Sequence, residues 1–126
     1  MRWPIPTLAA LAALSGCGDD DKPLRTATVP GASPIVIEAD EYSFDPGRVI
    51  VTGAPRDLRI TLDNVGSLAH NIRVLDGDRD LGGTRSFPAG EKRDATLKVP
   101  PGKYRLVCTV GDHEELGMKG ELEVRK

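Results

Sequence analysis

The sequence has few of the residues that carry most binding and catalytic chemistry. Only 4% of its 126 residues are aromatic, and it has two histidines, two cysteines and two methionines. It also has no basic excess, with 17 Lys and Arg against 19 Asp and Glu, so it lacks the positive field of nucleic-acid-binding proteins. Few aromatic side chains are available to stack on bases. The composition therefore excludes a nucleic-acid partner.

The N-terminus has an apolar run that is too short to span a bilayer. Arg2, the run from Leu8 to Leu14 and the small residues after it are typical of an export signal over residues 1–16. The ending Leu-Ser-Gly-Cys17 resembles a bacterial lipobox, in which cleavage precedes a cysteine that becomes lipid-modified. We therefore expect an exported protein, anchored to the bacterial cell membrane through Cys17 and facing the periplasm or the cell exterior.

Residues 17–34 have little apolar content and many Asp, Pro, Thr, Ser and Gly residues, which predicts a flexible tether. The folded domain is then expected over residues 35–126, a length that suits a single core. Without residues 1–16 the net formal charge is −3, because Arg2 is the only charged side chain removed.

From Ile35 onward the hydrophobic pattern has period two and shows no helical stripe of useful length. Leu58, Ile60 and Leu62 alternate with polar residues, as on a strand with one buried face. The same alternation recurs at Ile35/Ile37, Ile72/Val74, Ala95/Leu97/Val99, Tyr104/Leu106 and Leu122/Val124, with turn-forming residues between. Seven or eight short strands predict an all-β fold, a Greek-key antiparallel β-sandwich.

The rare residues fall into one set. Both histidines, His70 and His113, and the only Cys and Met outside the N-terminal segment, Cys108 and Met118, combine a thiolate, two imidazoles and a thioether. A His₂Cys site with a weak axial sulfur suits copper cycling between Cu(I) and Cu(II). Cys108, His113 and Met118 have four residues between successive members, so one loop can bend all three around an ion.

Strand parity indicates that these side chains point inward. Side chains alternate between faces, so His70 shares the face of Ile72 and Val74, while Cys108 shares the face of Leu106. Each lies at the end of its strand. We therefore expect the two to meet at one pole of the sandwich, under the loops.

On these residues the chain resembles the cupredoxins, the blue copper proteins related to plastocyanin and azurin, over roughly residues 35–126. The matching positions are His70-Asn71 and, around the C-terminal loop, Cys108, His113, Met118 and Gly120. The resemblance implies that His70, Cys108 and His113 are equatorial copper ligands and Met118 the axial one. It also implies that Asn71 hydrogen-bonds across the two ligand loops, which would orient the ligands.

The chain departs from the family pattern before the second histidine. Related sequences often have Val-Pro-Gly-His, whereas this one has Val110-Gly111-Asp112-His113. Asp112 is therefore expected to take the backbone shape of the family's glycine. Asp112, Glu114 and Glu115 also place negative charge around His113, where relatives often show an apolar surface. This edge is expected to dock a basic redox partner.

Other interpretations use the same residues. Cys17 and Cys108 are able to form a disulfide in an exported protein. A Cys/His pair also serves as nucleophile and base in hydrolases, but no oxyanion loop or orienting acid is evident. Zinc accepts His₂Cys, although structural zinc sites usually take four strong ligands rather than a thioether.

The sequence thus predicts a monomeric blue-copper protein that shuttles single electrons and is not an enzyme. The alternative is an envelope copper carrier or storage module without redox turnover. A third interpretation, an accessory domain whose site no longer binds metal, stays open because of Gly111-Asp112.

Overall fold

The computed structural model describes residues 24–126, so the predicted signal segment and the predicted lipidation site Cys17 lie outside the described residues. Residues 24–126 form ten strands and no helix. The strands are β1 (Thr26–Pro30), β2 (Ile35–Asp40), β3 (Ser43–Asp45), β4 (Arg48–Thr52), β5 (Leu58–Asn64), β6 (Arg73–Asp76), β7 (Arg79–Gly83), β8 (Lys92–Leu97), β9 (Gly102–Val107) and β10 (Lys119–Val124).

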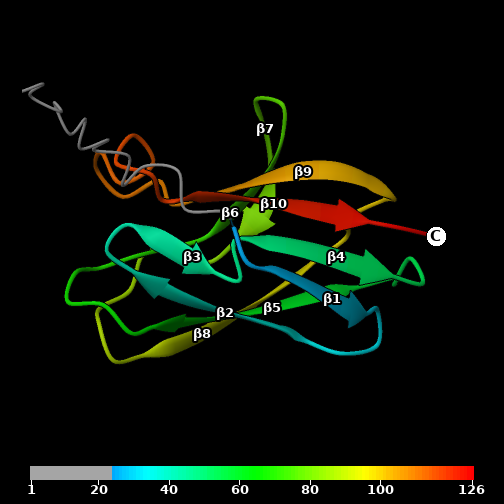
Figure 1. Ribbon diagram of the computed structural model, residues 1–126, viewed down its shortest axis with the longest axis horizontal. Helices are drawn as coiled ribbons and strands as arrows, with labels where there is room; N and C mark the ends of the chain where they lie inside the picture. Colours follow the sequence, from blue (N-terminus) through cyan, green and yellow to red (C-terminus); the bar gives the residue numbers. More distant parts are fainter. Residues whose placement is uncertain (1–23) are drawn as a thin grey trace, which may run out of the picture.

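The strands pack as two sheets, one above the other (Figure 1). One sheet has six strands in the order β1-β4-β10-β9-β6-β7, and the other has four in the order β3-β2-β5-β8. The chain crosses between the sheets several times, for example from β3 to β4 and back to β5. The predicted all-β sandwich is therefore confirmed.

Alternating side chains fill the space between the sheets. On β2 and β5 every second residue is buried, and the residues expected inside from their period-two pattern are all in the core. Burying each large aliphatic side chain contributes about 1.5–3 kcal/mol to folding, before the chain-entropy cost. The core includes Ile35, Ile37, Leu58, Ile60, Leu62, Ile72, Val74, Ala95, Leu97, Val99, Tyr104, Leu106, Leu122 and Val124.

Two details of the predicted fold are corrected. The sheets are mixed rather than antiparallel, because β1 with β4, β4 with β10 and β2 with β5 run parallel. Strands joined by a hairpin run antiparallel, whereas a connection through the opposite sheet allows parallel neighbours. The strand number exceeds the expected seven or eight partly because β3 is only three residues long and β7 ends in two glycines, so neither has a clear alternating pattern.

The folded domain also begins before the expected start at Ile35. Strand β1, which lies inside the predicted tether, pairs along its whole length with β4. Only Val29 of this strand packs against the core. An edge strand of this kind is held mainly by backbone hydrogen bonds, which explains why its apolar content did not reveal it.

Three loops gather at the pole of the sandwich opposite the C-terminus (Figure 1). They are the turn between β2 and β3, the loop between β5 and β6, and the long loop between β9 and β10. The candidate metal ligands lie in the second and third of these. Among residues 24–126, no helix has the length and apolarity needed to cross a bilayer.

Candidate metal centre

His70 is fixed by a short backbone ladder before β6. Its amide donates to the carbonyl of Phe87 (3.2 Å), and the amide of Phe87 donates back to the carbonyl of His70 (3.0 Å). This bridge turns the imidazole inward, where it is fully buried together with Ile72 and Val74. The predicted inward parity of His70 is therefore confirmed.

Cys108 follows the last residue of β9 and is also fully buried. Its amide donates to the carbonyl of Met118 (3.1 Å), and the amide of Met118 donates to the carbonyl of His113 (3.0 Å). The loop is further closed by the His113 amide, which donates to the carbonyl of Val110 (3.0 Å). These bonds hold the 108–118 segment, which contains no proline, as a compact set of turns.

The side chains of His70, Cys108 and His113 converge on one point. The Nδ1 atoms of the two histidines are 3.2 Å apart, and Cys108 Sγ lies 3.6 Å from His113 Nδ1 and 4.0 Å from His70 Nδ1. A triangle with these sides has a point about 2.1 Å from all three corners, close to the roughly 2.0–2.3 Å of metal bonds to imidazole and thiolate. The donor set therefore fits a single ion.

Met118 lies at the base of the same loop and is fully buried in the core cluster that contains Cys108. Its backbone is hydrogen-bonded to both Cys108 and His113, so Met118 lies next to two of the candidate ligands. Among residues 24–126, one group of His, Cys, Asp or Glu side chains has ligand atoms close enough together to bind one metal ion. It consists of His70, Cys108 and His113.

Asn71 links the two ligand-bearing loops. Its side-chain amide donates to Thr109 Oγ1, and its carbonyl oxygen accepts from the Thr109 amide, both at 2.8 Å. Thr109 directly follows Cys108, so these bonds join the His70 segment to the thiolate segment. This is the connection that the family resemblance implied for Asn71.

Asp112 does not take the glycine-like backbone conformation that was expected from the family pattern. Gly111, not Asp112, has the left-handed backbone conformation, with φ of 49°. A glycine adopts this conformation without the steric penalty of a Cβ atom. The left-handed residue of this turn is therefore one position earlier than the family pattern suggested, and His113 still reaches the site.

Two neighbouring residues of the β2–β3 turn, Glu41 and Tyr42, complete the surroundings, and no sequence pattern indicated either of them. Glu41 Oε1 lies 3.1 Å from His70 Nε2, and the ring of Tyr42 is 5.1 Å from that of His113, inclined by 60°. Backbone amides of Leu68 and Ser67 donate to the Glu41 carboxylate and lower its pKa from 4.5 to about 2. Glu41 is therefore a carboxylate at neutral pH.

The outer rim of the site is acidic, but less so than the sequence suggested. Glu114 is paired with Arg105 of β9, with 2.8 Å between Oε2 and Nη2. Asp112 and Glu115 are exposed and have no ion-pair partner among residues 24–126. His113 itself is only 8% exposed, so little of its side chain reaches the surface.

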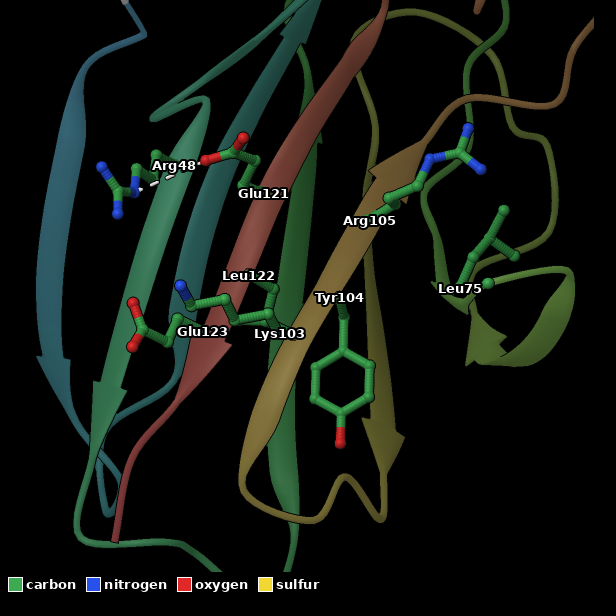
Figure 2. Close-up of a pocket in the computed structure, with 9 residues that line it drawn as sticks. Arg48, Leu75, Lys103, Tyr104, Arg105, Glu121, Leu122 and Glu123 are labelled. Atoms are coloured by element: carbon green, nitrogen blue, oxygen red, sulfur yellow. Dashed lines mark ion pairs between the residues drawn. The ribbon is translucent and has the colours of Figure 1, made fainter.

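A separate surface pocket of about 460 Å³ does not contain these residues (Figure 2). It is formed by β4, β9, β10 and the end of β6, and its exposed side chains carry charges of both signs. Arg48 Nε lies 3.5 Å from Glu121 Oε2 across it. Tyr104 donates its hydroxyl to the carbonyl of Pro100 at one end of the core. The pocket therefore shows no set of convergent ligand atoms.

Comparison with solved structures places the fold. Similar structures include dithionite-reduced auracyanin from the photosynthetic bacterium Roseiflexus castenholzii (TM-score 0.63, 20% identity, 79% of this chain and 98% of that chain). Auracyanin B is also similar (0.65, 21%, 78% and 88%), as is the azurin Az-iso2 from the obligate methylotroph Methylomonas sp. strain J (0.64, 14%, 75% and 99%). No sequence-family model matches the chain. Auracyanins and azurins are cupredoxins, so the predicted fold is confirmed.

Proposed function

We propose that this protein, which has the cupredoxin fold, binds one copper ion through His70, Cys108 and His113 and carries single electrons. The observation that supports this best is the triangle of ligand atoms, all within 4.8 Å of one another and all on buried side chains. Met118 is proposed as the weak axial ligand. Bound copper would supply a one-electron couple between Cu(II) and Cu(I).

The residues around the triangle hold the proposed ligands in position and keep water away from them. Asn71 and the backbone bonds of the 108–118 loop hold the thiolate and the second imidazole in place, while the core excludes water from Cys108. A site held in this way limits the rearrangement that accompanies electron transfer. His113 is the ligand at the rim, so we propose its ring edge as the route for the electron.

The proposal includes where the protein works. The N-terminal signal and lipobox pattern support an exported, lipid-anchored protein on the bacterial cell membrane. The exposed carboxylates of Asp112 and Glu115 support a redox partner with a basic docking surface. We propose that the protein acts as a monomer and has no enzymatic activity of its own.

The test is to titrate the purified protein with Cu(II) and record its visible absorption and electron paramagnetic resonance. One equivalent of copper is expected to give intense thiolate-to-copper charge transfer, which a Cys108→Ser variant loses. Absence of this band in the wild-type protein would contradict the proposed site. Ser at 108 keeps the size of the side chain, so the variant separates loss of the thiolate from loss of packing.

Metal exchange separates the electron carrier from a copper carrier. An electron carrier is expected to retain copper through repeated oxidation and reduction in the presence of a competing chelator. Rapid release of the ion to the chelator in either oxidation state would favour the carrier or storage module instead.

A further inference from the structure

Glu41 contacts His70, one of the proposed copper ligands. The role inferred for Glu41 at the copper centre rests on the proposed copper function. The Glu41 Oε1 atom accepts from the amides of Ser67 (2.8 Å) and Leu68 (2.7 Å) and lies 3.1 Å from His70 Nε2. These bonds join the β2–β3 turn to the β5–β6 loop just before the histidine. The Glu41 side chain is 24% exposed, whereas the His70 side chain is fully buried.

The contact determines which nitrogen of His70 carries the proton. An ionised carboxylate only accepts hydrogen bonds, so Nε2 must be the donor in this pair. In a neutral imidazole Nδ1 then has no proton and offers its lone pair. Nδ1 is the atom that faces His113 Nδ1 and Cys108 Sγ, so the tautomer leaves the correct atom free for a metal.

The local backbone leaves room for this carboxylate. A Cβ atom on Gly66 would lie 2.6 Å from Glu41 Oε1 and 2.9 Å from Oε2, closer than side-chain atoms approach each other. A glycine at this position is what allows the carboxylate to lie against the amides of Ser67 and Leu68. The environment therefore accommodates the Glu41 side chain where it reaches His70.

We propose that Glu41 is a positioning residue for the metal centre, which fixes His70 as the Nε2–H tautomer and places a negative charge behind the ligand. Carboxylate–histidine–metal arrangements orient the ring and raise the basicity of the ligand. A fixed negative charge also favours Cu(II) over Cu(I), because the higher charge gains more from it. Glu41 therefore strengthens metal binding and lowers the reduction potential.

The first test uses the metal-free protein, so it does not depend on copper function. The ¹⁵N chemical shifts of the His70 ring report the tautomer, and the wild-type protein is expected to show Nε2–H. Glu41→Ala removes the acceptor and is expected to give a mixture of tautomers, whereas Glu41→Gln keeps an acceptor oxygen and retains Nε2–H. An unchanged tautomer in Glu41→Ala would overturn the positioning role.

The second test uses the copper-loaded protein. Glu41→Ala is expected to weaken copper affinity by roughly 10- to 100-fold in a chelator competition, the usual cost of losing such a partner. Glu41→Gln is expected to raise the reduction potential. Glu38→Gln, which removes an exposed charge on the preceding strand β2, serves as the control. Equal potentials in the Glu41→Gln and Glu38→Gln variants would overturn the charge effect.

A third variant leaves the carboxylate in the chain. Gly66→Ala is expected to displace Glu41 and to reproduce the mixed tautomers of Glu41→Ala in the metal-free protein. Retention of the wild-type tautomer in a folded Gly66→Ala protein would contradict the proposal. If the wild-type protein shows Nε2–H but binds no copper, the proposed function fails while the positioning of His70 stands.

Discussion

At the scale of single residues, the site depends on side chains that hold ligands rather than on ligands alone. Asn71 shows this clearly, since it is 7% exposed and makes both of its hydrogen bonds to Thr109, the neighbour of Cys108. A buried polar group that loses its partner pays the cost of desolvation without compensation. The stability of the loops and the geometry of the centre are therefore coupled through one amide.

Asn71→Ala is expected to lower the free energy of unfolding of the metal-free protein by about 1–3 kcal/mol, because the Thr109 amide loses its acceptor. Chemical denaturation measures the change. Thr109→Val is the matched control, since it removes the hydroxyl but keeps the amide bond to Asn71 Oδ1, and it should cost less. A loss in Asn71→Ala no larger than in the control would be evidence against this link.

The cluster of candidate ligands could be predicted at this scale, and the residues that support it could not. His70, Cys108 and His113 stood out because their residue types are rare in the chain and two of them follow the buried parity of a strand. Glu41 is one of many acidic residues, and it lies 29 positions from His70 in the sequence. Period-two patterns do not say which turns meet at a pole, so this contact needed the structure.

At the scale of elements, the β6–β7 hairpin depends on one carboxylate. Asp80 accepts from Arg73 Nε and Nη2, both at 3.0 Å, and from the Gly82 amide at 2.8 Å. The Arg73 guanidinium, followed by the Gly82 amide, holds the pKa of Asp80 below its usual 3.8. Because the folded state prefers the ionised form, the stabilisation is present above pH 3.8 and is lost as the pH falls through the lowered pKa.

Asp80→Asn is therefore expected to reduce stability at neutral pH by up to about 1 kcal/mol, since the pair is partly exposed. The difference from wild type should shrink below pH 3.8, where protonation removes the same charge from the wild-type protein. Thermal unfolding across a pH series measures both. Asp78→Asn, a neighbouring acidic residue without an ion-pair partner among residues 24–126, is the control. A constant difference between Asp80→Asn and wild type at all pH values would contradict the linkage.

Strand β1 is the element that sequence patterns did not reveal. It has a single large apolar residue packed on the core, Val29, and its pairing with β4 is a backbone interaction that any sequence without internal proline can make. The amide of Arg48 donates to the carbonyl of Arg25 (3.1 Å) at the beginning of this pairing. Parallel strand pairs were missed for a similar reason, because alternation reports burial but not direction.

Deleting Thr26–Pro30 is expected to expose the edge of β4 to solvent. Amide hydrogen exchange should become faster at Arg48, whose acceptor lies next to the deleted segment. The amides of β5, in the other sheet, provide an internal control and should keep their protection. Unchanged exchange at Arg48 would show that the domain does begin at Ile35, as the sequence suggested.

At the scale of the whole molecule, we expect the charge around the ligand pole to set how the proposed redox partner approaches. Glu114 is neutralised by Arg105, which leaves Asp112 and Glu115 as the exposed charges nearest to His113 in the chain. Charges of one sign at a docking edge act mainly on the association rate and are screened by salt.

Asp112→Lys/Glu115→Lys is expected to slow oxidation of the copper-loaded protein by a cationic metal complex by about tenfold at low ionic strength. An anionic complex should react faster with the same variant. Stopped-flow kinetics over a salt series measures both rates. Glu38→Lys/Asp57→Lys, which changes two other exposed acidic residues and therefore shifts the net charge by the same amount, is the control. The differences should disappear at high salt. Rates that depend only on net charge and not on position would argue against an acidic docking edge.

One short turn, between β2 and β3, contacts both histidine side chains. Glu41 holds one imidazole and the adjacent Tyr42 covers the other, so the two rings are braced by the same short piece of backbone. Any partner, substitution or packing defect that lifts this turn loosens both rings together. Displacement of this turn should therefore change the positions of both histidine side chains at once, without an intermediate in which only one of them has moved.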